Sequence, residues 1–565
     1  MKVGKSNTKS KKKGERQMKK YIKNKCNENQ VKENKCFNYN NGITLVALVV
    51  TIVVLLILAG VSINLVIGQN GLISRAKEAA QKTKNATESE MQGMDDLATQ
   101  IAALSNTQSV FEGGNWNSTL GICTPKLGNN MVGVYWSDGS KNDNGTYKAS
   151  LTSTEKEVTS DQAEFSWNDW YNYRAETTEK LDSKQSRWAN AKSTVDGSYF
   201  VWIPRYESKI LSGEHTSTAG KIDVQFINTS TVTPTKDGYK VHPAFTTNLA
   251  LGGWDKELSG IWIAKYEMSM EQTTDNGATW NNVKASPGTG DKVTSQTVRM
   301  VSKPSYYSVN YISINNCFKN SINYSAEQNT GVNSHLIKNS EWGAATYLTH
   351  SKYGRNGNEV SVNNFCSDST SYARMTGFST GGKQDGITNE LGGKENLYNG
   401  KNGLDSSTTG NLYGIYDMNG GNWEYTSTMI TQYGISSGDM LYKELQYSLT
   451  GNIISKVPEN SDSNKLITVY PITLQESKNI KILEQYKNWN IMYGDAIYET
   501  SANVPDIYGA WNGDSADSVD QDGQLRTFLA RGGGWANRSS GIFAFIASDG
   551  FAHNDIGYRL VLITE

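Results

Sequence analysis

Cysteine and histidine carry most nucleophilic, redox and transition-metal chemistry in proteins, and this chain of 565 residues holds five of each. They are scattered. No CxxC pair, HExxH motif or other metal-ligand spacing occurs, and no Ser-His-Asp order resembles a hydrolytic triad. The sequence also points to no pair of carboxylates placed for acid–base catalysis. The residues that could do chemistry therefore indicate neither a zinc site, nor a disulfide framework, nor a hydrolytic centre.

The N-terminal part carries the strongest signal for position in the cell. Residues 43–67 form an apolar run without a charge, and as a helix they span about 37 Å, more than the roughly 30 Å of a hydrocarbon core. Residues 1–42 hold thirteen Lys or Arg against three Glu, which keeps this leader cytoplasmic. The run is too long for a secretory signal peptide. The sequence predicts a single-pass protein of the cell membrane with an extracellular C-terminal domain.

The junction GITLVA (42–47) resembles the signal of type IV prepilins. In that family a peptidase cuts after the glycine, so the resemblance implies processing between Gly42 and Ile43, with prepilin peptidase and pilin-like subunits as partners. Pilins usually carry Glu five residues after the cut, where this chain has Ala47. A lone carboxylate is costly in a bilayer, so its absence suits a single-pass anchor at least as well as a filament subunit.

Composition changes after the apolar run. Gly is frequent at 53 and Pro rare at 9, with 30 Tyr and 14 Trp, a profile typical of β-rich extracellular domains. The part beyond the leader is mildly acidic, so nothing suggests a nucleic-acid partner. The sequence divides into a basic leader (1–42), a transmembrane or pilin-like helix (43–67), a helical stalk (68–104), a β-rich segment (105–198) and an outer domain (199–563) with an insertion (429–500).

Several motifs of the outer domain occur in a fixed order. FVWIPRYESKI (200–210) and GIWIAKYEMSM (260–270) are expected strands that look alike, and helices are expected after residues 304 and 334. The ordered set is similar to the formylglycine-generating enzyme family, or sulfatase-modifying factors, which have a C-type-lectin fold. The matching residues are Tyr266-Glu267, Cys317, Glu341-Trp342, GIYDM (414–418), WEY (423–425), RGGGW (531–535) and GYR (557–559).

The resemblance implies an α+β fold, mostly irregular and β-rich, with the N-terminal helix and stalk ahead of it. Its tryptophans are expected in the core, and Arg531, Arg559, Glu341 and Glu424 are candidates for structural ion pairs. The family's oxidase binds copper through two cysteines near the Arg-Gly-Gly motif, and residues 531–565 contain no cysteine. Copper is therefore not expected, Cys317 is expected to be structural, and the domain is predicted not to be an enzyme.

One metal remains among the implications of the resemblance. Family members can hold calcium in the loop before Trp-Glu, and the matching positions here are Asp417, Gly420, Asn422 and Glu424. Hard oxygen ligands at such spacing suit Ca²⁺, which would have a structural role. The alternative is that Asp417 and Glu424 pair within the turn and bind no ion.

The last candidates lie between two framework motifs, where residues 537–555 are dense in small, polar and aromatic side chains. In a C-type-lectin fold such a stretch can form a rigidly presented binding face. Its layout also looks like the variable region of proteins diversified by retroelements. Exposed aromatic and charged side chains on a rigid loop make binding hot spots. The candidate ligand-binding residues are Arg538, Phe545, Asp549, Phe551 and His553.

Taken together, the sequence predicts a membrane-anchored, surface-exposed protein whose outer domain binds or adheres without catalysis. The ligand is an extracellular glycan or protein that the sequence does not identify. Two alternatives stay open. One is a pilin-like structural subunit of a surface filament, and the other is an oxidase-type enzyme on the same fold.

Overall fold

The chain divides into two compact units, residues 1–108 and 109–565, and the computed structural model describes mainly the second. Each unit is considered by itself. The described residues are 50, 52–54, 114–141, 147–159, 169–174, 186–248, 251–328, 333–363, 374–379, 394–431, 465–471, 492–502, 509–517, 528–535 and 540–564.

In the N-terminal unit the structure describes Val50 and 52–54, which are helical with between 47% and 54% of their surface exposed. Gly42, Ile43 and the expected stalk lie outside the described residues. Within the ranges given above, no helix combines the length and the apolar character needed to cross a bilayer. The membrane anchor therefore stays a prediction from the sequence.

The larger sheet of the C-terminal unit has seven antiparallel strands in the order β14-β22-β10-β6-β5-β3-β4. β3 and β5 come from the segment before residue 199, so this segment and the outer domain share one sheet. The strands are β3 (Met131–Ser137), β4 (Thr154–Glu157), β5 (Asn190–Ser193), β6 (Tyr199–Pro204), β10 (Gly260–Ala264), β14 (Asn333–Leu336) and β22 (Leu560–Ile563).

A second sheet of five strands has the order β18-β20-β19-β15-β21 and mixes parallel with antiparallel pairs. It collects the C-terminal motifs: WEY forms β15, RGGGW begins at the end of β19, and GYR begins in β21. Its strands are β15 (Trp423–Tyr425), β18 (Ala516–Asp517), β19 (Phe528–Arg531), β20 (Phe545–Ser548) and β21 (Ile556–Tyr558).

Small sheets and short helices complete the described part. The small sheets are β8-β7-β9, β12-β11-β13, β1-β2 and the parallel pair β16-β17. Their strands are β1 (Trp116–Asn117), β2 (Ile122–Cys123), β7 (Tyr206–Ser212), β8 (Lys221–Phe226), β9 (Lys240–Val241), β11 (Ser269–Gln272), β12 (Asn281–Asn282), β13 (Val298–Val301), β16 (Thr428–Thr431) and β17 (Thr468–Pro471). The helices are α5 (Ile314–Gln328), α6 (Asn339–His350), η1 (Pro243–Phe245), η3 (Lys394–Asn396), η4 (Gly403–Ser406) and η6 (Trp511–Gly513).

The two similar sequence strands become central neighbours in the large sheet. β6 pairs with β10 in a register that places Trp202 opposite Trp262, and both indoles are fully buried with their ring centroids 5.2 Å apart. The predicted single strand over 200–210 is divided in the structure, since β6 ends at Pro204 and β7 begins at Tyr206 in another sheet. Proline has no N–H for a ladder bond, which explains the break there.

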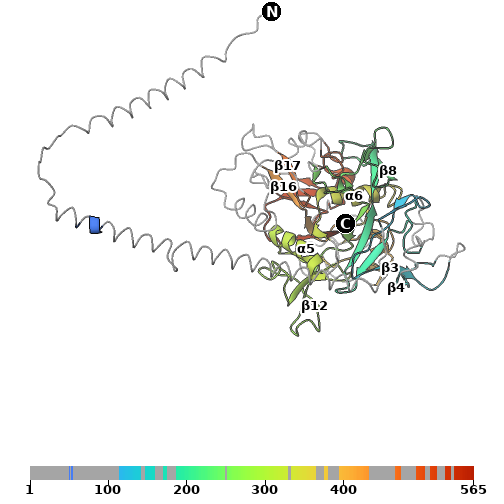
Figure 1. Ribbon diagram of the computed structural model, residues 1–565. Helices are drawn as coiled ribbons and strands as arrows, with labels where there is room; N and C mark the ends of the chain where they lie inside the picture. The colour runs from blue at the N-terminus through green and yellow to red at the C-terminus, as the bar shows by residue number, and fades with distance from the viewer. Residues whose placement is uncertain are drawn as a thin grey trace, which may run out of the picture. The chain divides into compact units, whose positions relative to one another are not determined.

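The helix α6 is buried along its whole length and packs against β8 and η1, as Figure 1 shows for β8. Its N-terminus is closed by Glu341, whose carboxylate accepts the backbone N–H of Lys338 at 2.8 Å. Trp342 is fully buried and donates its indole N–H to the carbonyl of Ile542 at 2.8 Å. The prediction of a mostly β-rich domain with few helices is confirmed, and so is the core position of this tryptophan.

Candidate functional site

The Glu424–Arg559 ion pair lies at the junction of the two large sheets. Arg559 separates β21 from β22, and Glu424 lies in β15. The guanidinium donates from Nε and Nη2 to the two carboxylate oxygens at 2.8 and 2.7 Å, and both side chains are fully buried. It also donates to the backbone carbonyls of Ala264 at 2.8 Å and Tyr416 at 2.9 Å. This two-pronged geometry is the strong form of a charged hydrogen bond.

Two further carboxylates are buried close to this pair. Glu267 accepts the backbone N–H of Asn422 at 2.8 Å, and a side chain at Gly421 would collide with its carboxylate. Asp417 accepts the backbone N–H of Gly377 at 2.7 Å. Burial raises the pKa of Asp417 to about 6, and burial together with the negative charges of Glu424 and Asp417 raises the pKa of Glu267 well above its usual range. These acids fix the glycine-rich turn and are about 1% exposed.

The four residues expected to hold calcium lie in this turn. Glu424 already has both oxygens bound to Arg559, whose guanidinium supplies the positive charge that an ion would bring. Buried oxygens without a hydrogen-bond partner remain on Asp417 and Asn422. Within the described ranges, no group of three or more His, Cys, Asp or Glu side chains is placed to hold a metal. Arg559 therefore competes with an ion for Glu424, and calcium at Asp417, Gly420, Asn422 and Glu424 stays a prediction from the resemblance.

The described cysteines offer no exposed nucleophile. Cys123 and Cys317 are free thiols with no exposed surface. Burial raises the pKa of Cys123 to about 11 and that of Cys317 well above its usual range, which disfavours the reactive thiolate. Cys317 packs in the main core in the first half of α5, as the structural interpretation of this residue predicted.

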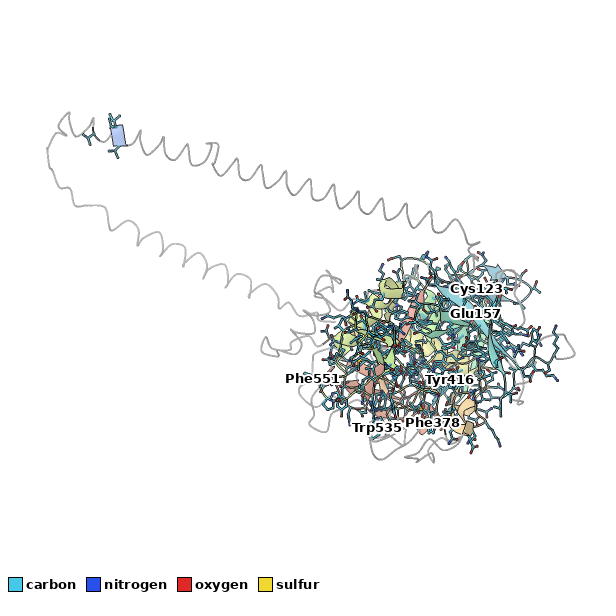
Figure 2. The ribbon with its side chains drawn as sticks, turned by 90° about the horizontal axis from the view of Figure 1, so that it is seen from below. Cys123, Glu157, Phe378, Tyr416, Trp535 and Phe551 are labelled. Atoms are coloured by element: carbon cyan, nitrogen blue, oxygen red, sulfur yellow. The ribbon has the colours of Figure 1, made fainter. Side chains whose placement is uncertain are left out.

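The predicted ligand-binding residues separate into three groups. Arg538 lies outside the described residues. Phe545 is fully buried in β20 as part of the core, so it cannot touch a ligand at the surface without rearrangement. Asp549, Phe551 and His553 come together in one loop after β20. The Phe551 side chain is 52% exposed and lies at the edge of the domain in Figure 2.

Hydrogen bonds hold the backbone of this loop on both sides of the exposed ring. Asp549 accepts the N–H of Phe551 at 3.0 Å, and the same oxygen lies 2.7 Å from Nε2 of His553. The carbonyl of Phe551 accepts the hydroxyl of Tyr425 at 2.7 Å, and Tyr311 donates its N–H to the carbonyl of His553 at 2.7 Å. Asp549 and His553 thus shape the turn that presents Phe551.

Sequence reasoning missed the anchoring roles of Tyr425 and Tyr311. A signal for Tyr425 was present, because the tyrosine of the WEY motif carries a hydroxyl that can donate a hydrogen bond. Tyr311 has a backbone φ of 51°, which no sequence pattern here indicated. Both residues act through the backbone of 551–553, so they are positioning residues.

Comparison with known proteins adds little to this description. No family model matches the sequence, and no curated protein matches it. A solved structure, Treponema denticola variable protein 1, is similar at 11% identity and a TM-score of 0.25, over 66% of this chain and 99% of that one. A similarity at this level carries no argument about fold or function, so neither the prepilin resemblance nor the formylglycine-generating enzyme resemblance is established by it.

The buried ion pair predicts a large loss of stability on neutral substitution. Glu424→Gln leaves the Arg559 guanidinium buried without its counter-charge, and removal of one partner of a buried pair typically costs about 3–5 kcal/mol. Denaturant unfolding of the full-length chain should give this difference. Glu155→Gln, in a partly exposed pair with Lys192 at 2.8 Å, is the matched control and should cost at most about 1 kcal/mol. Equal effects of the two changes would contradict the central role of the pair.

The geometry of the turn also predicts indifference to calcium. EDTA should leave the melting temperature of the wild-type chain unchanged, because Arg559 already neutralises Glu424. If calcium did bind, a free calcium concentration of about 100 times its Kd would add about 2.7 kcal/mol to the free energy of unfolding. A melting curve detects a change of this size readily. Asp417→Asn serves as the matched variant. A fall in the wild-type melting temperature that this substitution abolishes would show that calcium binds there after all.

Proposed function

We propose that the chain is a membrane-anchored protein whose C-terminal domain is displayed outside the cell and binds a ligand without catalysis. The observation that carries the binding part is the loop around Phe551. Its aromatic ring is 52% exposed although the backbone on both sides is hydrogen bonded to Tyr425, Asp549 and Tyr311. An aromatic side chain held in this way loses little conformational entropy on binding.

The same loop has the composition of a binding hot spot. Exposed aromatic side chains surrounded by polar groups contribute most of the free energy at many protein interfaces. Phe551 is flanked by the Asp549–His553 pair, whose side chains are 27% and 37% exposed. The partner class proposed is an extracellular glycan or a protein. Genetic variation of residues 537–555 by a retroelement is part of the proposal and rests on the layout of the sequence alone.

The described groups capable of chemistry favour binding over catalysis. Glu267, Asp417 and Glu424 are buried and hydrogen bonded, and Cys123 and Cys317 are buried thiols with raised pKa values. The anchoring part of the proposal rests on the basic leader and the apolar run 43–67. Prepilin peptidase and pilin-like subunits are proposed partners of that N-terminal part.

The topology is tested with protease added to intact cells after removal of any wall. Residues 68–565 should be digested, because the positive leader retains the N-terminus in the cytoplasm. A cytoplasmic protein of the same cells is the control and should stay intact. Full protection of the large domain under these conditions would exclude display outside the cell.

The binding face is tested with Phe551→Ala in the full-length chain purified in detergent. Wild type and variant are applied to a printed glycan array and to fixed mammalian and bacterial cells, and bound protein is measured by fluorescence. Loss of a hot-spot side chain costs about 2 kcal/mol or more, so signal should fall by at least about tenfold.

The control is Leu211→Ala, since Leu211 in β7 is 55% exposed and far in sequence from the loop. Both variants should keep the melting temperature of the wild type, because both side chains are largely in water. Binding by Phe551→Ala at the wild-type level, or no binding by the wild type to either panel, would overturn this assignment.

A further inference from the structure

Two buried carboxyl groups lie together at the end of the insertion. Asp495 and Glu499 are each 4% exposed and are close enough to hydrogen bond to one another. The N–H of Gly494 donates to Oε1 of Glu499 at 2.6 Å, which brings the second carboxyl back beside the first. Two hydroxyls also contact them, since Tyr470 donates to Oδ2 of Asp495 at 2.6 Å and Tyr347 to Oε1 of Glu499 at 2.5 Å. We call Asp495 and Glu499 the carboxyl pair.

One oxygen of the carboxyl pair has no donor within the described residues. Both oxygens of Asp495 accept hydrogen bonds, since Ile497 donates its N–H to Oδ1 at 3.0 Å and Tyr470 donates to Oδ2. Oε2 of Glu499 is buried and has no hydrogen-bond partner. Two negative charges so close in a buried site are costly. A proton on one carboxyl lets it donate to the other, which removes one charge and satisfies the remaining oxygen.

The groups packed around the carboxyl pair leave this proton in place. Among the described residues, Arg531 in β19 is the cation that faces the pair, and its guanidinium donates to the backbone carbonyl of Asp495 at 2.8 Å. The ring of His242, just before η1, lies 5.5 Å from that of Tyr347, and burial lowers the pKa of His242 to about 3, so it is neutral at physiological pH. Burial raises the pKa of Tyr347 in α6 and of Tyr470 in β17 well above the usual range, so both keep their hydroxyl protons.

The backbone next to the carboxyl pair is held in a conformation that costs energy. Ala496 is fully buried and has a φ of 55°, in the left-handed region that is unfavourable for a residue with a Cβ. Arg531 donates to the carbonyl of Ala496 at 3.0 Å, and the carboxyl pair accepts the neighbouring N–H groups of Gly494 and Ile497. The local backbone therefore depends on these side chains, and it is released when their contacts are lost.

We propose that the carboxyl pair shares one proton in the folded domain and acts as a pH-sensitive latch on residues 492–502. The latch is closed while the proton is bound, because one carboxyl then donates to the other. Loss of the proton places two negative charges in a buried site, so the segment opens and both carboxyls reach water. This inference goes beyond the loop of Phe551, since it concerns a conformational change at other residues and needs no ligand.

The bound proton makes the latch weaker as the pH rises. Burial, and after it the charge of Glu499, raise the pKa of Asp495 well above its usual range, although the charge of Arg531 opposes them. In the open segment both carboxyls have ordinary pKa values of about 4. Above about pH 5 the closed form therefore holds one proton more than the open form, and each pH unit weakens closure about tenfold until the raised pKa is passed. The stability that the latch supplies is complete below about pH 4 and is lost as the pH rises.

Hydrogen exchange of the full-length chain in detergent tests the latch from about pH 5 to about pH 8. After correction for the intrinsic exchange rate, peptides that cover residues 492–502 should lose protection about tenfold per pH unit below the raised pKa. Peptides from β6 and β10 should exchange more slowly than this segment at every pH, because the opening is local.

Asp495→Asn removes one titrating group but keeps a side chain of the same shape, whose amide can donate to Glu499 in place of the proton. Protection of the segment in this variant should be constant over the same pH range. Glu499→Gln is a second variant with the same expected result, and a melting curve shows whether each variant is folded. Asp255→Asn is the matched control, because the carboxylate of Asp255 is 71% exposed beside Lys465, and it should keep the pH dependence of the wild type.

Three results would overturn the inference. The first is constant protection of residues 492–502 in the wild type, which decides the matter even if neither variant folds. The second is a pH dependence in folded Asp495→Asn or Glu499→Gln as steep as that of the Asp255→Asn control. The third is exchange of the segment at the same rate as β6 and β10, which would show unfolding of the whole domain instead of a latch.

Discussion

The architecture depends on one buried guanidinium. Arg559 stands where the chain passes from the five-stranded sheet into the seven-stranded sheet, and its side chain joins β15, the end of β10 and the glycine-rich turn. Desolvation of an ion pair is expensive, and it is offset only when geometry is good and the remaining donors are satisfied. Here Arg559 makes four hydrogen bonds. These bonds hold the glycine-rich turn, which lacks regular backbone pairing.

Sequence reasoning succeeded where burial follows directly from residue type. Trp342, Trp423, Trp535 and Cys317 were expected in the core or as structural residues, and all four are buried. The partners of the charged residues were harder to predict, because the partner of a side chain depends on the fold. Glu424 and Arg559 pair across 135 residues of sequence, whereas Arg531 donates to the carbonyls of Asp495 and Ala496 at the end of the insertion. Every residue has a backbone carbonyl, so the pattern of charges in a sequence cannot predict which carbonyls an arginine will bind.

The aromatic residues of the C-terminal stretch illustrate a second limit. Phe545 and Phe551 look equivalent in sequence, but Phe545 is fully buried and Phe551 is 52% exposed. The difference arises because β20 pairs with strands on both sides and is covered, while Phe551 lies beyond the end of β20 at Ser548. Neighbours that come from distant segments decide which ring faces water. The sequence could therefore locate the candidate site to a segment, but it could not show which side chains of that segment are exposed and which are buried.

The position of β22 affects how the protein is made. This strand, residues 560–563, lies between β10 and β14, and Arg559 just before it reaches a carbonyl 295 residues earlier. The large sheet therefore cannot close during synthesis, and contacts of such long sequence separation form slowly. A chain that loses its reading frame upstream lacks an inner strand and exposes the edges of β10 and β14, which favour aggregation. Completion of the large sheet thus waits for β22, which comes latest in the chain among its seven strands.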